Sequence, residues 1–312
     1  MNIFQAYFSG LRKAAGLPRP VFVIYFVNLL LALLIVFPLY SITNTEIGAS
    51  LNVNSLLGQF SWSVFSDFFR DNIGAVKAVL AQAKWILLIY WLLSVFFAGG
   101  IIRTLNEDKF SMASFFHGAG FNFFRFLGIS IIVLLLHMLV ILIIYIPAFL
   151  IITESDFGSE TPIVITLGIA FALHAFLLVW LFALNDYSKF YAVLHNKNSL
   201  NAFAGGFRYV LKKFGKAYFL YLFLLILPAA SVYGYFRADA EIDTHTKNGL
   251  IAAVFVQQAF IILRIWFRIW IFASPLKMYK RDFEKQSIPA AEKTPVSISE
   301  TEKTTDTEEA KK

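Results

Sequence analysis

The sequence contains no cysteine and, for its length, few charged residues. Without Cys the chain forms no disulfide and offers neither a thiolate metal ligand nor a cysteine nucleophile. Only 15% of its 312 residues are charged and 58% are apolar, whereas a typical soluble domain is about 25% charged and about 45–50% apolar. This excess of apolar residues indicates that much of the chain lies in a non-aqueous solvent.

Motifs that name a reaction are also missing from the sequence. It has no glycine-rich phosphate loop, no zinc-protease helix motif and no nucleophile elbow. We therefore expect a protein that is not an enzyme and that holds no cofactor and no metal. The net charge of +7 does not indicate nucleic-acid binding, because the basic residues stand beside the apolar runs and form no continuous basic surface.

Six apolar runs are long enough to cross a membrane as helices, which takes roughly 20 residues each. They predict an all-α fold, a polytopic membrane domain over residues 1–283 with six transmembrane helices and additional interfacial helices. Pro147 in the third run predicts a kink. No repeat relates the first three runs to the last three. The six runs are residues 21–42, 85–102, 126–152, 162–184, 218–235 and 249–272.

The distribution of basic residues predicts the orientation of these spans. Of the 27 Lys and Arg residues, 20 lie on the side of the two termini, 5 lie on the opposite side and 2 lie inside the sixth span. Because cytoplasmic loops carry the excess of positive charge, both termini are predicted to be cytoplasmic. Residues 284–312 are poor in large apolar side chains, so we expect them to form a disordered cytoplasmic tail.

Four connecting segments are predicted to lie at the membrane interface: residues 2–17, 56–69, 112–124 and 199–214. Segment 112–124 is expected to be broken by Gly118 and Gly120. Segment 199–214 is the clearest amphipathic helix. Such a helix either lies among anionic lipid headgroups or packs against the base of the bundle. Its candidate lipid-facing basic residues are Arg208, Lys212, Lys213 and Lys216.

The sixth span places Gln257, Arg264 and Arg268 on one helical face. A central Arg costs at least about 2.5 kcal/mol on insertion scales, so Arg264 is expected to face an acceptor inside the bundle. Asp186, at the end of the fourth span, lies at a suitable depth, and Arg268 is close enough to the end of its span to reach the headgroups. The arrangement predicts an ion pair between Asp186 and Arg264. The alternative is a cationic site for an anionic substrate or lipid headgroup.

Two histidines lie near the middle of the bilayer, His137 in the third span and His174 in the fourth. The two spans are joined by a short loop and are therefore antiparallel neighbours. We expect a hydrogen bond between the helices. A proton or substrate pathway and a haem or metal site are the alternatives, although a metal normally has three or four protein ligands and no acid or Cys accompanies the pair.

Several short motifs resemble those of a group of uncharacterised bacterial multi-pass membrane proteins. The group in turn resembles, distantly, the membrane domain of some glycerophosphodiester phosphodiesterases. The resemblance covers residues 1–283 and implies a six-helix fold in the bacterial cytoplasmic (inner) membrane; the chain has no room for the catalytic domain, so no activity is transferred. The motifs are Arg19-Pro20, Asn28-Leu29-Leu30-Leu31-Ala32, Phe115-Phe116, Asn122-Phe123-Phe124-Arg125-Phe126, Asp186-Tyr187-Ser188-Lys189, and Gln257-Gln258 with Arg264 and Arg268.

These observations support two main functional hypotheses. The first is a non-enzymatic membrane module that engages anionic lipid or an unknown protein partner through its basic cytoplasmic surface. The second is a small transporter or permease with a polar substrate site near the bilayer midplane, beside His137, His174 and Arg264. A lipid-processing intramembrane enzyme is a third, weaker hypothesis.

Overall fold

The computed structural model describes residues 2–46, 73–107, 109–154, 160–243 and 246–291, together with residues 62, 63, 66 and 70. Within these residues the fold is all-α, as predicted, and has no strand. Most of the predicted interfacial segment 56–69 lies outside the described residues. The helices are α1 (Ile3–Ala15), α2 (Pro18–Glu46), α5 (Ile73–Glu107), α6 (Met112–Glu154), α7 (Thr161–Leu194), α8 (Ser199–Lys212), α9 (Phe214–Ala240) and α10 (Lys247–Ala291).

Six of these helices (α2, α5, α6, α7, α9 and α10) are long and apolar enough to cross a membrane. The prediction of a multi-pass membrane protein with six transmembrane helices is therefore confirmed. Several helices are longer than predicted, since α5 begins at Ile73 and α10 continues to Ala291. Residues 284–291, expected to belong to the tail, are thus part of α10. Residues 292–312 lie outside the described residues.

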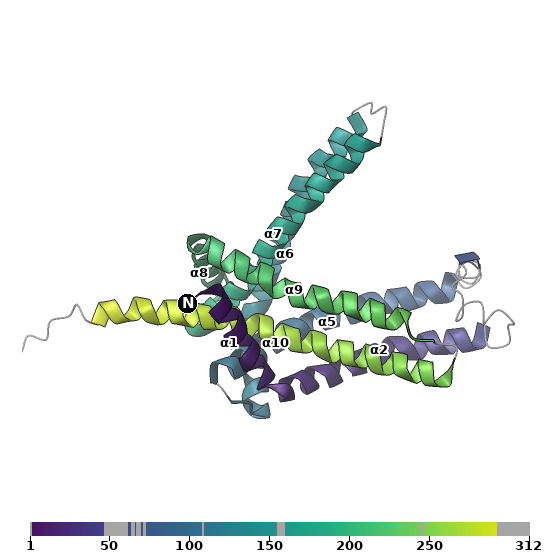
Figure 1. Cartoon of the computed structure of the whole chain (residues 1–312), viewed down its shortest axis with the longest axis horizontal. Coiled ribbons are helices and arrows are strands. Elements are labelled where there is room, and N and C mark those ends of the chain that lie inside the picture. Colours follow the sequence, from purple (N-terminus) through teal and green to yellow (C-terminus); the bar gives the residue numbers. More distant parts are fainter. Residues whose placement is uncertain are drawn as a thin grey trace, which may run out of the picture.

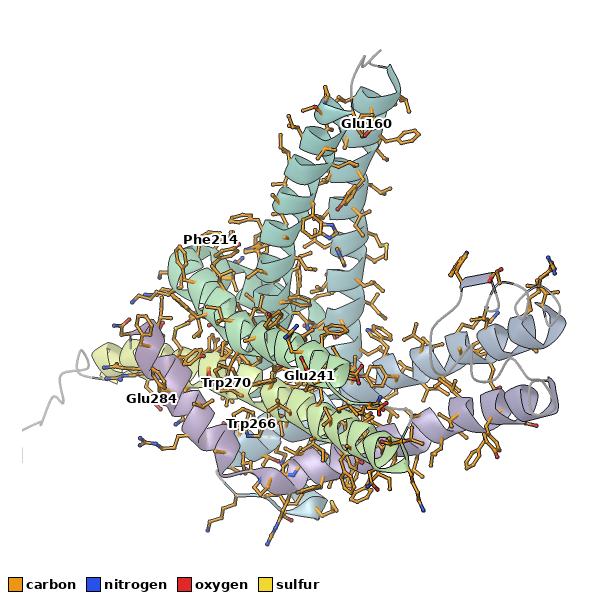
Figure 2. All side chains as sticks on the ribbon, turned by 45° about the vertical axis from the view of Figure 1, so that its right-hand side comes forward. Glu160, Phe214, Glu241, Trp266, Trp270 and Glu284 are labelled. Carbon is orange, nitrogen blue, oxygen red and sulfur yellow. The ribbon has the colours of Figure 1, made fainter. Side chains whose placement is uncertain are left out.

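The long helices form three hairpins, α2–α5, α6–α7 and α9–α10. The α6–α7 hairpin leans away from the other four long helices (Figure 1). We call the end of the bundle that holds α1, α8 and the turn between α5 and α6 the basic end, and the opposite end the acidic end. Figure 2 shows Glu160 at the acidic tip of the α6–α7 hairpin, far from Phe214 and Trp270 near the basic end.

The outer half of the α6–α7 hairpin has a very small apolar core of its own. Its fully buried residues are Ile144, Ala148 and Ala170. Large apolar side chains such as Phe149 and Phe171 project outward, with 64% and 69% of their surface exposed. Exposed apolar surface on this scale requires a covering of lipid chains.

Segment 112–124 is not interrupted by its glycines, because α6 is continuous from Met112 to Glu154. Gly118 allows α6 to approach α5 closely, since an added Cβ would lie 2.6 Å from the Arg103 Cβ. Phe115 is completely buried in the same contact. The glycine therefore serves helix packing at the basic end and does not act as a break. Pro147 lies inside the same helix.

The short helices α1 and α8 each pack through a stripe of small residues. An added Cβ at Gly10 of α1 would lie 2.6 Å from the Cα of Ser274 on α10, and one at Gly206 of α8 would lie 2.6 Å from the Cα of Ser188 on α7. The backbones can approach this closely only because both positions lack a side chain. The buried stripes are Ala6, Gly10 and Ala14 on α1, and Ala202, Gly206 and Val210 on α8.

Several bulky apolar residues of these two helices point away from the bundle. Phe8 on α1 is 60% exposed and Leu200 on α8 is 70% exposed. A helix with a small buried face and a greasy outer face suits a position at the edge of the membrane. Packing on the bundle base and contact with lipid are thus compatible for α8.

The similarity between α1 and α8 reveals an internal repeat that a comparison of the first three spans with the last three misses. Each helix is capped by an Asn side chain, Asn2 or Asn198. The long helix that follows begins the same number of residues after the start of the short helix in both cases. The helices that receive them also correspond, because α10 and α7 carry Trp and Ser at the same spacing. The matched residues are Ala6 and Ala202, Gly10 and Gly206, Arg12 and Arg208, Trp266 and Trp180, and Ser274 and Ser188.

Candidate functional site

Asp186 on α7 is the centre of a buried polar cluster in the basic half of the bundle. Its side chain is 2% exposed, and its Oδ2 accepts a hydrogen bond of 3.0 Å from the Tyr221 hydroxyl on α9. Its Oδ1 lies 3.8 Å from an Arg268 guanidinium nitrogen on α10 and accepts a bond of 3.4 Å from Asn185 Nδ2. One carboxylate thus connects three transmembrane helices.

The ion pair between α7 and α10 therefore involves Arg268, and its predicted assignment to Arg264 is wrong. Asp186 is level with Arg268, whereas Arg264 is one turn, roughly 6 Å, farther toward the acidic end. Arg268 also packs on the Phe272 ring at 4.3 Å, so it is held in the bundle. Among the described residues Arg264 has no hydrogen bond or ion pair, and its guanidinium carbon lies 6.0 Å from the centre of the Phe260 ring, a long cation–π distance.

Positive charge exceeds negative charge around this cluster. Lys189, on the same helix as Asp186, is only 2% exposed, and its Nζ lies 5.8 Å from the Phe126 ring. Lys189 and Arg268 are two cations near one carboxylate, Asp186, and Arg264 adds a third cation one turn farther along α10. Unbalanced charge inside a membrane is costly, so such a cluster favours the arrival of an anion.

A cavity of about 540 Å³ lies between α2, α5 and α10, and we call it the cationic cavity. Arg264 and Arg268 line it from α10, Asn28 lines it from α2 and Ser94 lines it from α5. Its remaining lining residues are apolar or aromatic, and none of those described is a carboxylate. Two guanidinium groups with an amide and a hydroxyl match the hydrogen-bonding needs of a phosphate or carboxylate group.

A smaller cavity of about 230 Å³ lies at the base of the α6–α7 hairpin. Lys189 and His137 line it together with Arg268 and Ser94, the two residues that it shares with the cationic cavity. Arg268 therefore stands between the two cavities. Asn185 also lines this smaller cavity, and its Oδ1 is buried with no hydrogen-bond partner among the residues that the structure describes.

The structure brings His137 and His174 together, as expected. Their Nε2 atoms are 3.0 Å apart, and the His174 Nδ1 lies 3.0 Å from the Tyr145 hydroxyl. The result is a hydrogen-bonded chain from Tyr145 through His174 to His137, which lines the smaller cavity. Among the described residues no group of three or more His, Cys, Asp or Glu side chains is placed to hold a metal. The geometry is that of an interhelical hydrogen-bonded triad.

Gln257 does not join the polar network, although the sequence pattern places it on the arginine face. It is exposed, and its neighbour Gln258 makes the contact between the helices, accepting a partly buried hydrogen bond of 2.8 Å from the Tyr25 hydroxyl on α2. The difference of one residue arises because α10 packs against α2 at this level, while Arg264 and Arg268 face the cavity beside it.

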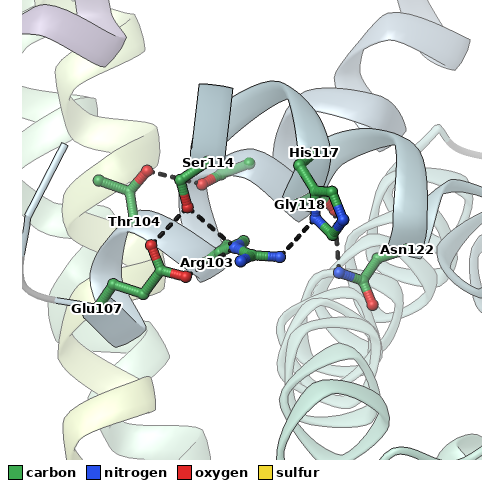
Figure 3. Close-up of polar contacts among 8 residues, drawn as sticks. Arg103, Thr104, Glu107, Ser114, His117, Gly118 and Asn122 are labelled. Atoms are coloured by element: carbon green, nitrogen blue, oxygen red, sulfur yellow. Dashed lines mark hydrogen bonds and ion pairs between the residues drawn. The ribbon is translucent and has the colours of Figure 1, made fainter. Parts of the chain in front are cut away.

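A second polar cluster closes the turn between α5 and α6 at the basic end (Figure 3). Arg103 Nε lies 2.7 Å from Glu107 and donates to Ser114 Oγ at 3.0 Å, and its NH1 lies 2.6 Å from His117 Nδ1. Every charged group in this cluster has a partner. The cluster therefore acts as a structural clamp between the two helices.

The basic residues predicted for the amphipathic helix are divided between two helices. Arg208 and Lys212 are exposed on α8, Lys213 is the C-cap residue that follows it, and Lys216 is exposed on α9. Tyr209 points inward and donates to Asp282 Oδ2 at 3.1 Å. Burial, reinforced by Asp282, raises the Tyr209 pKa, so its hydroxyl remains a donor. The helix is thus anchored on its inner side and basic on its outer side.

The sequence pattern missed four residues of these networks. Tyr25, Tyr145 and Tyr221 carry no sequence signal, because a Tyr in a transmembrane run is usually an interfacial anchor. Lys189 offered a signal, since it lies one turn beyond Asp186 and could have been placed inside α7. The fourth helix is in fact longer than predicted and includes Lys189.

The resemblance based on short motifs stays a prediction. No protein-family model matches this chain, and comparisons with curated proteins and with solved structures return no match.

Proposed function

We propose that this protein is a non-enzymatic membrane module that binds an anionic, phosphate-type group in the cationic cavity. Lipid headgroups and free phosphate share this chemistry. The protein would thus be a lipid-engaging module in which Arg264 and Arg268 contact the anionic group of the ligand. The exposed basic residues of α8 then serve as a secondary surface for anionic headgroups.

One observation carries the proposal: Arg264 faces a 540 Å³ cavity and has no polar partner among the described residues. An arginine in a membrane span normally finds an acceptor, because its charge is poorly solvated there. Asp186 is already engaged by Arg268 and Tyr221. An anion entering the cavity would supply the acceptor that Arg264 lacks.

The orientation of the site follows from the charge asymmetry. With 20 of 27 basic residues on the side of the termini, the basic end is assigned to the cytoplasm, and the membrane to the bacterial cytoplasmic membrane. The cationic cavity would then lie in the cytoplasmic half of the bilayer. It would be within reach of lipids of the inner leaflet and of cytoplasmic anions.

The test compares Arg264→Gln with Arg237→Gln in nanodiscs of phosphatidylcholine. Arg237 is a matched control, because it lies outside the cavity with 65% of its side chain exposed and, within the described part of the chain, pairs only with Glu241. Binding of phosphatidylglycerol and of inorganic phosphate is measured by native mass spectrometry. Arg264→Gln should weaken the binding of at least one of these by roughly tenfold or more, the value of one charge-assisted hydrogen bond. Equal binding by both variants would refute the proposal.

The permease hypothesis has one observation in its favour. Arg268 lines both cavities, so a substrate passing from one to the other would move past it. Proteoliposomes separate the two functions, because a permease releases trapped phosphate at a rate that Arg268→Gln lowers. A binding module leaves that release at the rate of empty liposomes.

A further inference from the structure

An apolar groove continues the cationic cavity toward the acidic end. This groove has a volume of about 480 Å³ and lies between α2 and α5. Asn28 and Tyr90 line both the groove and the cationic cavity. The two spaces therefore meet at these residues, and we call the second one the α2–α5 groove.

The order of residues along the helices gives the direction of the groove. On α2, Ile24 lines only the cationic cavity, Asn28 lines both spaces, and Ile35 lines only the groove. On α5 the order is Ser94, then Tyr90, then Ala83. At 1.5 Å per residue, Asn28 and Ile35 are roughly 10 Å apart along the helix axis. The groove thus runs outward from the guanidinium groups, parallel to the helices.

The two spaces differ sharply in chemistry. Two arginines line the cationic cavity. The groove is walled by aliphatic side chains such as Leu31 and Leu87, and among the described residues its only charged lining residue is Lys84, near the acidic end. A charged compartment followed by a narrow apolar one matches the shape of an amphiphile with its headgroup at one end.

We propose that the ligand of the cationic cavity is an anionic amphiphile, with its phosphate-type headgroup at Arg264 and Arg268 and one acyl chain in the α2–α5 groove. This inference rests on the proposed function. The chain runs in the direction of an inner-leaflet lipid if the basic end is cytoplasmic. Because lipid tails are as apolar as the groove, moving the acyl chain from lipid into the groove adds little affinity. The groove instead orients the chain, and a side chain that fills the groove clashes with it. The amphiphile's advantage over a soluble anion is that it is already concentrated in the membrane.

The experiment uses the full chain in phosphatidylcholine nanodiscs and three probes: dodecyl phosphate, inorganic phosphate and dodecanol. Bound dodecyl phosphate is counted by native mass spectrometry, and the other two are tested as competitors. Ala83→Phe fills the groove from α5. Ala81→Phe is the matched control, because Ala81 is exposed two residues away and does not line the groove. Ile35→Trp fills the groove from α2 in case Ala83→Phe fails to fold.

The expected result is that dodecyl phosphate binds and neither inorganic phosphate nor dodecanol displaces it at equal concentration. A groove-filling variant should weaken its binding by roughly tenfold, because the inserted ring clashes with the acyl chain of the bound amphiphile, while Ala81→Phe leaves it unchanged. Arg264→Gln should weaken it by a similar factor.

Three outcomes overturn the inference, and they are distinguishable. The first outcome combines three results: inorganic phosphate competes equally, Arg264→Gln abolishes binding, and the groove variants have no effect. In that case the position of the acyl chain is wrong, while the anion site stands. If dodecanol competes equally, the headgroup assignment is wrong. If Arg264→Gln leaves the binding of every probe unchanged, the proposed function fails and this inference with it.

Discussion

Replacing Asp186 with Ala is expected to destabilise the folded protein by about 3 kcal/mol. Its carboxylate is 2% exposed and approaches Arg268 at 3.8 Å, and it accepts the hydrogen bond from Tyr221. Removing one partner of a buried pair typically costs about 3–5 kcal/mol, because the other charge is left unpaired. We take the lower end because 40% of the Arg268 side chain is exposed, which lets solvent or headgroups screen part of its charge.

The excess of positive charge predicts an asymmetry between the two partners. Asp186→Ala leaves Arg268 and the nearby Lys189 without a carboxylate. Arg268→Ala leaves the Asp186 carboxylate with another cation nearby, Lys189. The carboxylate is then not left without a compensating charge, so Arg268→Ala should lower the stability of the fold by only about 1 kcal/mol. Asp186→Asn keeps an acceptor for Tyr221 and removes only the charge, and it should fall between the two.

The assay is reversible unfolding of the purified protein in mixed detergent micelles, followed by circular dichroism. Glu241→Ala is the control, because the pair of Glu241 with Arg237 is more than half exposed and should contribute less than about 1 kcal/mol. If Asp186→Ala costs no more than Glu241→Ala, or if Arg268→Ala costs more than Asp186→Ala, the charge balance described for this cluster is wrong.

Three further predictions concern helix packing and titration. Gly10→Ala and Gly206→Ala should each destabilise the folded protein by about 1–3 kcal/mol, because the new Cβ meets the backbone of a neighbouring helix. Gly215 has open space around it, so Gly215→Ala should be neutral or stabilising in the same unfolding assay. His174→Phe should cost about 1–2 kcal/mol, because it removes both contacts of the triad; an unchanged stability would contradict a structural role. Burial, followed by repulsion from two lysines of α10, lowers the Lys13 pKa to about 8. Lys13 binds its proton more tightly when α1 is undocked, so docking of α1 should strengthen as pH rises from about 8 to about 10.5. The mobility of a spin label attached at Phe8→Cys should therefore fall over this pH range. A constant mobility would refute the prediction.

The fold could be predicted from hydrophobic runs alone, because a bilayer imposes one simple rule on helix length. Six spans and the two amphipathic helices at the basic end follow from that rule. The helix ends could not be predicted, since α5, α7 and α10 are longer than the roughly 20 residues that a bilayer requires and continue into segments that are less apolar. Gly118 was predicted to break a helix because propensity was considered without the neighbouring helix, on which the glycine packs.

The sequence predicts which residues belong to the candidate site better than it predicts which of them contact each other. Asp186, Arg268, His137 and His174 do make polar contacts between helices. Partner choice depends on depth to within one helical turn, and sequence spacing does not supply that accuracy. The same limit explains why Gln257 was selected when its neighbour makes the contact. The cavities could not be predicted at all, because they depend on how three helices diverge.

The docking of α1 on α10 has a consequence for biogenesis. Tyr7 accepts a hydrogen bond of 3.2 Å from Trp270 Nε1, and Lys277 donates to the Ser9 carbonyl oxygen. α1 therefore leaves the ribosome well before α10, the helix on which it docks. Until α10 has been synthesised and inserted, the glycine face of α1 stays uncovered, and the nascent protein depends on the lipid surface or a chaperone to shield it.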